Sequence, residues 1–157
     1  MVPIGEELSR GVEFDVSGRI LPYWSIMASY AFNVAEISKA PEGIKDLNLQ
    51  RPGTPRHSAN LWTKFIVPTG MLRHLGIGVG LNGVSERKGQ VGRRENVVSY
   101  PGYGLLNLAL YYKVREVQLQ LNLNNALNKQ YYISGYDRLR SFPGAPRNIN
   151  LTATYRF

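Results

Sequence analysis

The stretch that decides the fold is the last one, Arg147-Asn148-Ile149-Asn150-Leu151-Thr152-Ala153-Thr154-Tyr155-Arg156-Phe157. Its odd-numbered residues after position 147 are apolar or aromatic, and its even-numbered residues are polar or charged. Because successive side chains of a strand point to opposite faces, this alternation predicts a β-strand with one apolar and one polar face. Residues 117–124 repeat the pattern. Alternation alone does not separate a soluble β-sandwich from a barrel in lipid.

The rest of the chain predicts more strands of the same kind. The expected strands are residues 11–20, 24–34, 56–67, 72–85, 102–113, 116–125 and 147–157. Their connections alternate between tight turns and long segments, the long ones being residues 35–55, 86–100 and 126–146. An up-and-down outer-membrane barrel has this asymmetry, with short periplasmic turns at one rim and long extracellular loops at the other. The predicted class is all-β, an antiparallel transmembrane β-barrel fragment of about seven long strands.

Aromatic residues gather at the strand ends beside the short turns and at the carboxy terminus. They are Trp24, Phe65, Tyr112, Tyr155 and Phe157. Membrane barrels place such residues in girdles at the two membrane interfaces. The alternative is an aromatic cluster in a soluble core, but a core would gather these residues in the middle of the strands.

Composition excludes some functions and leaves others open. The absence of cysteine excludes disulfides, thiol catalysis and zinc–thiolate sites. A formal charge of +8 is compatible with nucleic acid, an anionic membrane surface, an acidic ligand or basic loops without a partner. No apolar run approaches the roughly 20 residues of a membrane helix. The first residues show no secretory signal, which by itself would suggest a cytoplasmic protein. The strand pattern instead favours a chain that begins partway through something larger.

Four motifs resemble the carboxy-terminal barrel of TonB-dependent siderophore receptors. They are SRGVE at residues 9–13, PRHSANLWT at 55–63, LNLNNALNKQYY at 121–132 and PGAPR at 143–147, followed by the terminal Phe157. The resemblance implies a barrel of about 22 strands whose lumen holds a plug domain. About seven strands are too few to close such a barrel. We therefore expect residues 1–157 to be the carboxy-terminal portion of the barrel, without the plug and the amino-terminal strands.

The resemblance also implies a location and partners. The location is the outer membrane of a Gram-negative bacterium, and the function is uptake of ferric siderophores energised through TonB. The expected partners are a ferric siderophore, the TonB complex through the missing amino-terminal region, outer-membrane lipid and lipopolysaccharide, and the assembly machinery. That machinery would recognise the final strand through Leu151, Ala153, Tyr155 and Phe157. We expect no cofactor, because the iron travels as a siderophore chelate, and no nucleic acid as a partner.

Two clusters in the long loops are the candidate ligand contacts. They comprise Arg93, Arg94 and Tyr100 in the second loop and Tyr132, Tyr136, Arg138 and Arg140 in the third. Arginine offers a planar set of donors and tyrosine an aromatic face with a hydroxyl, so this mixture can hold an anionic or hydroxamate iron chelate. The alternatives are contact with lipopolysaccharide phosphates or solvent, and binding of single-stranded nucleic acid.

Other features are weak evidence for chemistry. Gly78, Gly80 and Gly83 match G-x-G-x-x-G, but they lie within a predicted strand with no helix after it, so we expect a strip that lacks side chains on the inner wall. His57 and His74 lack metal-ligand spacing. We expect no enzyme, although a histidine acting with Asp15 or Ser58 stays open.

Two other functions stay open, and the first of them shares every physical feature derived above. One is a passive porin-like barrel. The other is a soluble β-barrel that binds nucleic acid or sugar.

Overall fold

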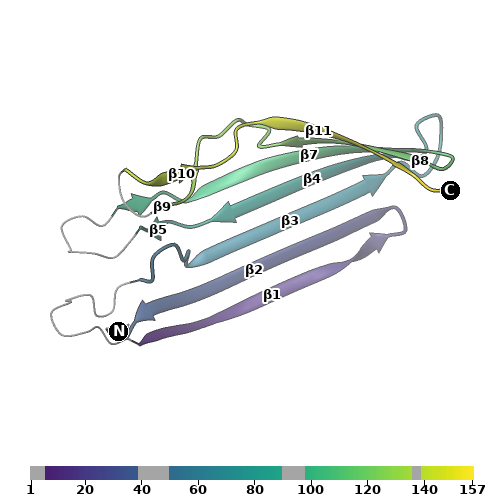
Figure 1. The fold of residues 1–157 in the computed structure, drawn as a ribbon. Coiled ribbons are helices and arrows are strands. Elements are labelled where there is room, and N and C mark those ends of the chain that lie inside the picture. Colours follow the sequence, from purple (N-terminus) through teal and green to yellow (C-terminus); the bar gives the residue numbers. More distant parts are fainter. Residues whose placement is uncertain (1–5, 39–49, 90–97, 136–138) are drawn as a thin grey trace.

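One antiparallel sheet of seven strands makes up most of the molecule (Figure 1). The computed structural model describes residues 6–38, 50–89, 98–135 and 139–157. The strands lie side by side in the order β1 (Glu7–Leu21), β2 (Trp24–Ile37), β3 (His57–Ile66), β4 (Leu75–Val84), β7 (Tyr103–Val114), β8 (Val117–Asn124) and β11 (Asn148–Tyr155). All seven predicted strands are therefore confirmed. No helix in the described residues is long and apolar enough to cross a bilayer.

The boundaries differ from the prediction mainly at β1 and β2. β1 begins at Glu7, because Glu7 already pairs with Ile37 of β2. From there the two strands stay paired as far as the Leu21–Trp24 turn, with one irregularity after Arg19. The first turn, Pro22–Tyr23, is as expected. β4 begins at Leu75, later than predicted, because residues 71–74 form a turn.

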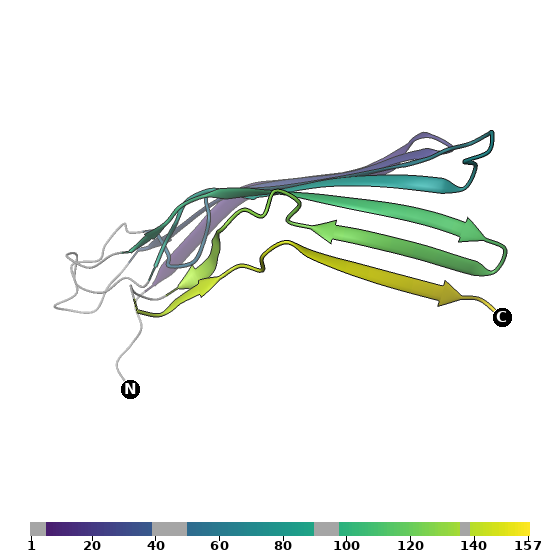
Figure 2. The same ribbon diagram turned by 90° about the horizontal axis from the view of Figure 1, so that it is seen from above.

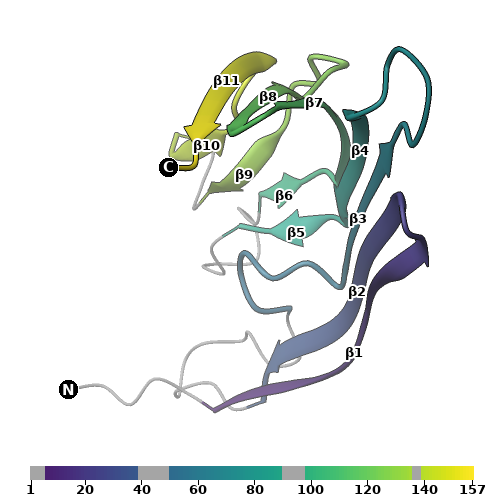
Figure 3. The ribbon, with the colours of Figure 1, turned by 90° about the vertical axis from the view of Figure 1, so that its right-hand side faces the viewer.

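The long connections contain strands that the sequence did not predict. β5 (Arg87–Lys88) pairs with β6 (Ser99–Tyr100), and β9 (Tyr132–Gly135) pairs with β10 (Ser141–Pro143). The prediction of residues 86–100 and 126–146 as loops was wrong at these positions. The four segments are two to four residues long, too short for alternation to be detected. We call the two-stranded pairs β5–β6 and β9–β10 the ribbons. Figures 2 and 3 show that the main sheet twists and curves, and that both of these pairs lie at one end of it.

The strand register separates an apolar face from a polar face. Facing residues of paired strands lie on the same side of a sheet. One apolar row contains Val16, Ala28, Leu61, Leu81 and Leu106, and another contains Leu110, Leu121 and Leu151. We call this side the apolar face. The opposite side, the polar face, holds Ser29, Asn60, Asn82, Gln120 and Thr152 among others.

No second layer covers the apolar face. Among the described residues no large side chain is fully buried, and the buried apolar residues are Ala35, Tyr100 and Ala109. Leu119 is 39% exposed and Ile149 is 66% exposed. A soluble β-sandwich buries such rows against a second sheet about 10 Å away. Within the part of the chain that the structure describes, the apolar face therefore has no protein cover.

The predicted strip without side chains is confirmed on the polar face of β4. A Cβ added at Gly78 would lie 2.7 Å from Trp62 Cζ2, and one added at Gly80 would meet the same indole more closely. Glycine at these positions lets Trp62 lie flat across β4. Because the motif lies within a strand that is paired on both sides, it is not a dinucleotide fingerprint.

Candidate functional site

The three long connections meet at one end of the sheet, opposite the tight turns (Figure 1). The first contacts the second through Gly53, whose N–H donates to the carbonyl of Lys88 at 2.8 Å. The second and third meet where β6 lies beside β9. We call this region the loop end. It is defined by residues 50–54, 86–89, 98–103, 131–135 and 139–144.

Arg87 joins the second connection to the third. Its side chain is buried, with 6% of the residue exposed. Nη1 donates to the carbonyl of Ile133 at 2.5 Å and Nη2 to that of Tyr132 at 2.6 Å. The guanidinium carbon lies 5.2 Å from the centre of the Tyr103 ring, which is within reach of a cation–π interaction. Arg87 is thus an internal tie between loops, a role that its place in an arginine-rich loop did not indicate.

Four tyrosines pack around this tie. The rings of Tyr103 and Tyr131 have centres 4.4 Å apart, and those of Tyr100 and Tyr132 have centres 5.9 Å apart. The Tyr100 hydroxyl also hydrogen-bonds with Ser141 Oγ at 2.9 Å. Since Tyr100 is 4% exposed, it holds the two ribbons together here, and direct contact with a ligand would require them to separate.

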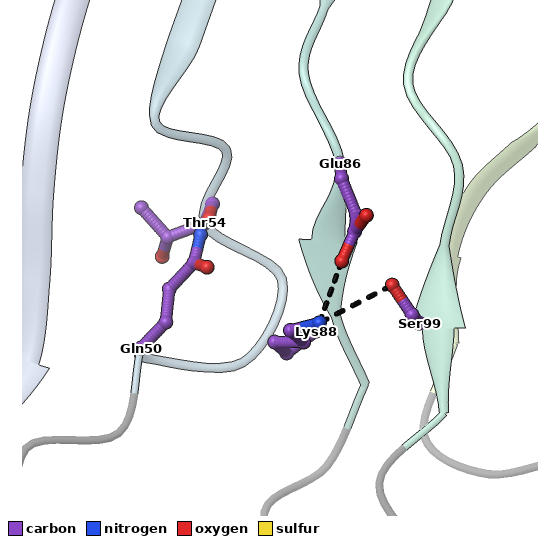
Figure 4. A network of polar contacts seen from close by, with 5 residues as sticks. All are labelled: Gln50, Thr54, Glu86, Lys88 and Ser99. Atoms are coloured by element: carbon purple, nitrogen blue, oxygen red, sulfur yellow. Dashed lines mark hydrogen bonds and ion pairs between the residues drawn. The ribbon is translucent and has the colours of Figure 1, made fainter.

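Figure 4 shows polar contacts of the first and second connections, which lie side by side at the loop end. Lys88 Nζ lies 2.5 Å from Glu86 Oε1 and 3.5 Å from Ser99 Oγ. The hydrogen bond from Lys88 holds the pKa of Glu86 below its ordinary value. Gln50 Nε2 donates to the carbonyl of Thr54 at 2.5 Å and closes the segment that reaches β5. The loop end is therefore ordered by contacts between all three connections.

The predicted ligand contacts divide into two groups. Arg93, Arg94, Tyr136 and Arg138 lie outside the described residues. Of the others, Tyr132 is 46% exposed and Arg140 is exposed between β9 and β10, whereas Tyr100 is buried. Tyr100 and Tyr132 are brought together, from positions 32 residues apart in the chain. All seven assignments as ligand contacts stay predictions.

The polar face carries a row of hydrogen-bonded polar side chains, most of them amides, that crosses four strands, β2, β3, β4 and β7. Asn60 Nδ2 donates to Ser29 Oγ at 3.3 Å, Asn82 Nδ2 to Asn60 Oδ1 at 2.6 Å, and Asn107 Nδ2 to Asn82 Oδ1 at 2.5 Å. Asn107 Oδ1 in turn accepts from the backbone N–H of Asn125 at 2.9 Å. The sequence did not predict this row, because the strand register decides which amides meet.

Asn125 ends this row as a buried connector. It is 3% exposed, and its side chain bonds with the backbone of Lys129 and Ala145. Beside the row, the polar face forms a hollow of about 400 Å³, whose lining includes Asp15, Ser17, Asn60, Trp62 and Asn82.

His57 and Asp15 do not form an acid–base pair. His57 Nδ1 lies 2.8 Å from the Tyr30 hydroxyl, with its ring 5.1 Å from that of Phe32. His57 pairs with Phe32, and Asp15 pairs with Ser29, so His57 and Asp15 lie on opposite faces of the sheet. The described residues contain no group of three potential metal ligands among His, Cys, Asp and Glu.

The predicted assembly signal lies on an open edge. β11 pairs with β8, and in the described residues its other side has no partner strand. Leu151 and Tyr155 are exposed on the apolar face at 71% and 63%, and the rings of Tyr155 and Phe157 lie 6.3 Å apart. A free edge with aromatic residues at its end can pair with another strand. Its recognition by assembly machinery stays a prediction.

One prediction concerns the tie at Arg87. Arg87→Met is expected to remove both hydrogen bonds to β9 and weaken the contact between the ribbons by about 2 kcal/mol, because bonds from a buried charged donor contribute about 1.5–3 kcal/mol. Hydrogen exchange at the amides of β9 should accelerate by roughly 30-fold. Lys129→Met, at an exposed residue of the same end, is the control and should leave that exchange unchanged. Equal exchange in the two variants would contradict the role of Arg87.

Comparison with known proteins gives one family and several named relatives. Residues 1–126 match the family described as TonB dependent receptor-like, beta-barrel. The chain is 30% identical to the catecholate siderophore receptor Fiu of Escherichia coli K12 over 159 residues, which are 98% of this chain and 20% of Fiu. It is 27% identical to the metal-pseudopaline receptor CntO of Pseudomonas aeruginosa over 157 residues, or 98% of this chain and 21% of CntO.

Solved structures give the same result. The sheet superposes on the closed form of Fiu with a TM-score of 0.82 and 28% identity, covering 98% of this chain and 21% of that one. It superposes on the siderophore receptor PiuA of Acinetobacter baumannii with a TM-score of 0.83 and 26% identity, covering 96% of this chain and 22% of PiuA. The chain thus spans about a fifth of the length of the relatives it matches.

Proposed function

The chain belongs to the family of TonB-dependent receptor β-barrels, and on that premise we propose that it forms wall strands and external loops of an outer-membrane receptor for ferric siderophores. TonB-dependent receptors of this kind are outer-membrane proteins of Gram-negative bacteria. The relatives it matches bear the names of siderophore and metal-chelate receptors rather than of enzymes. The proposed activity is inward movement of an iron chelate with energy supplied through TonB.

The observation that carries the proposal is the single-layer sheet with one continuous apolar face. Five of its strands span 10 to 15 residues and the other two span 8, close to the roughly 9–11 residues with which a tilted strand crosses the hydrocarbon layer. Lipid cannot hydrogen-bond an open strand edge, so a sheet in a membrane must close into a barrel. We propose that further strands, from the same polypeptide or another, pair with the free sides of β1 and β11.

The two ends and the two faces then have distinct roles. The polar face, with its amide row and its hollow, lines the lumen, and the apolar face meets lipid. The ordered loop end faces the outside, where Tyr132, Arg140 and the predicted residues outside the described ranges contact the chelate. The tight turns face the periplasm. The aromatic residues at the turn ends of β2, β3 and β7 then lie at the periplasmic interface of the outer membrane.

Uptake of labelled iron tests this function. Iron-limited cells that carry the native gene, with its natural flanking sequence, are offered ferric complexes of a catecholate and a hydroxamate siderophore. We expect saturable uptake of at least one complex, which falls to the level of cells lacking the gene when the proton gradient is collapsed. TonB draws its energy from that gradient.

Two results would overturn the proposal. Uptake that survives collapse of the proton gradient would indicate a passive pore. Recovery of the protein as a stable monomer in the detergent-free soluble fraction would indicate a water-soluble β protein, because the apolar face would then need cover that the sheet does not provide.

A further inference from the structure

At the end of the sheet opposite the loops, a groove combines exposed apolar and basic side chains. It has a volume of about 500 Å³ and is lined by Met71, Arg73 and His74 of the β3–β4 connection and by Tyr112, Lys113, Val114 and Arg115 of β7 and its turn. We call it the turn groove. Both of its segments lie at the end of the sheet where β3 and β7 finish (Figure 1).

The apolar part of the turn groove continues the apolar face. Tyr112 pairs with Leu75 on one side and Leu119 on the other, and Val114 pairs with Val117. Tyr112 and Val114 are 42% and 46% exposed, and Met71 is almost fully exposed. An acyl chain that covers Leu119 would therefore reach this groove without crossing a polar surface.

The basic part of the turn groove has no acidic counterpart in its lining. Arg73, Lys113 and Arg115 are three cations, and the lining contains neither aspartate nor glutamate. All three are exposed, and no carboxylate among the described residues lies within ion-pair distance of them. Glu116, the nearest acid in the chain, lines a neighbouring hollow that it shares with Lys113, Arg115 and Arg156, and it makes no ion pair with these cations.

We propose that the turn groove binds one anionic phospholipid of the membrane leaflet on the side of the tight turns. The phosphate lies between Arg73 and Arg115, and the acyl chains lie along Met71, Tyr112 and Val114. Lys113 pairs with Gln118 and so lies on the polar face, away from the acyl chains. Arginine and lysine near a membrane surface attract anionic headgroups, and arginine binds phosphate through two parallel hydrogen bonds. The proposal commits to a lipid and not to a free anion, because Arg73 and Arg115 line the same groove as the apolar side chains of Met71, Tyr112 and Val114. It rests on the proposed function only in requiring that the sheet cross a membrane.

Charge removal in the groove can leave the turns intact. Arg115 has φ of 50°, a left-handed conformation that asparagine adopts readily, so Arg115→Asn suits the β7–β8 turn. Arg73→Gln removes the second charge from an exposed turn residue. The matched control is Lys129→Gln with Arg147→Gln, which removes two exposed positive charges near the loop end.

The test uses the native protein in nanodiscs of phosphatidylethanolamine with a minor share of phosphatidylglycerol. Native mass spectrometry counts the phosphatidylglycerol retained by each protein. We expect the unaltered protein and the control to retain one phosphatidylglycerol, and the groove double variant to bind it roughly 30-fold more weakly, because each basic residue near the surface contributes about fivefold.

Four results would overturn the inference. Equal retention by the double variant and the unaltered protein would show that the groove does not hold the lipid, as would be the case if an acidic protein were its partner. Equal loss of phosphatidylglycerol by the control variant would show that binding depends on the total positive charge of the protein and not on the turn groove. Failure to enter the nanodiscs would overturn both the lipid site and the receptor, whereas insertion without phosphatidylglycerol enrichment would overturn the lipid site alone.

Discussion

Gly11→Ala is expected to destabilise the sheet by about 3 kcal/mol, the upper end of the range for overpacking. A Cβ at Gly11 would collide with the backbone carbonyl oxygen of Phe32, which lies on the paired strand β2. A backbone atom cannot move aside as a flexible side chain can, so β2 would have to shift. Phe32 also pairs with His57, so the disturbance would reach β3. Urea unfolding of the native protein in lipid vesicles measures the loss.

Gly18→Ala is the matched control on the same strand. No atom lies within 4 Å of a Cβ built there, so the added methyl group meets open space. Because glycine loses more conformational entropy on folding than alanine, this change should be neutral or stabilising by less than about 1 kcal/mol. If both variants unfold at the same urea concentration, the close approach of β1 and β2 at Gly11 does not limit stability.

The 157-residue chain by itself, in aqueous buffer without detergent, is expected to aggregate. In the described residues β1 and β11 each present one unpaired side, and unpaired edges recruit other strands. The exposed apolar face adds a surface far larger than soluble monomers tolerate, with Val12, Phe14 and Leu151 each more than 60% exposed. Size-exclusion chromatography with light scattering should show large particles and little monomer.

Variants can separate the two causes of aggregation. Replacing Leu119, Leu121 and Leu151 together by threonine should reduce aggregation without abolishing it, because the edges remain. Replacing Gln118, Gln120 and Asn150 by threonine on the polar face of the same strands is the control and should change little. A monodisperse sample of the unaltered chain with a sharp cooperative melt would contradict the expectation.

The seven long strands could be predicted because their signal is local. In a run such as residues 117–124, each side chain shows which face it occupies, and the tight turns show where the chain reverses. The alternation of short and long connections then gave the up-and-down order. The short ribbons at the loop end escaped prediction because β5 and β6 have only two residues each, too few for a period to appear.

The loop end shows where residue type alone is insufficient. By residue type alone, Arg87 and Tyr100 cannot be distinguished from an arginine and a tyrosine in an exposed loop. In the structure both are buried between the ribbons. Their burial depends on β9, which follows more than 30 residues later. Likewise, the register between β4 and β7, rather than sequence spacing, brings Asn107 to Asn82.

The sequence by itself determined the strands, their order along the chain and the division into an apolar and a polar face, because a period of two is a property of the extended backbone. Only the tertiary structure decided that no second layer covers the apolar face, and which loop residues are buried. Those features depend on contacts between segments far apart in the chain, and in such contacts a side chain's partners are set by strand register and loop packing rather than by its neighbours in sequence.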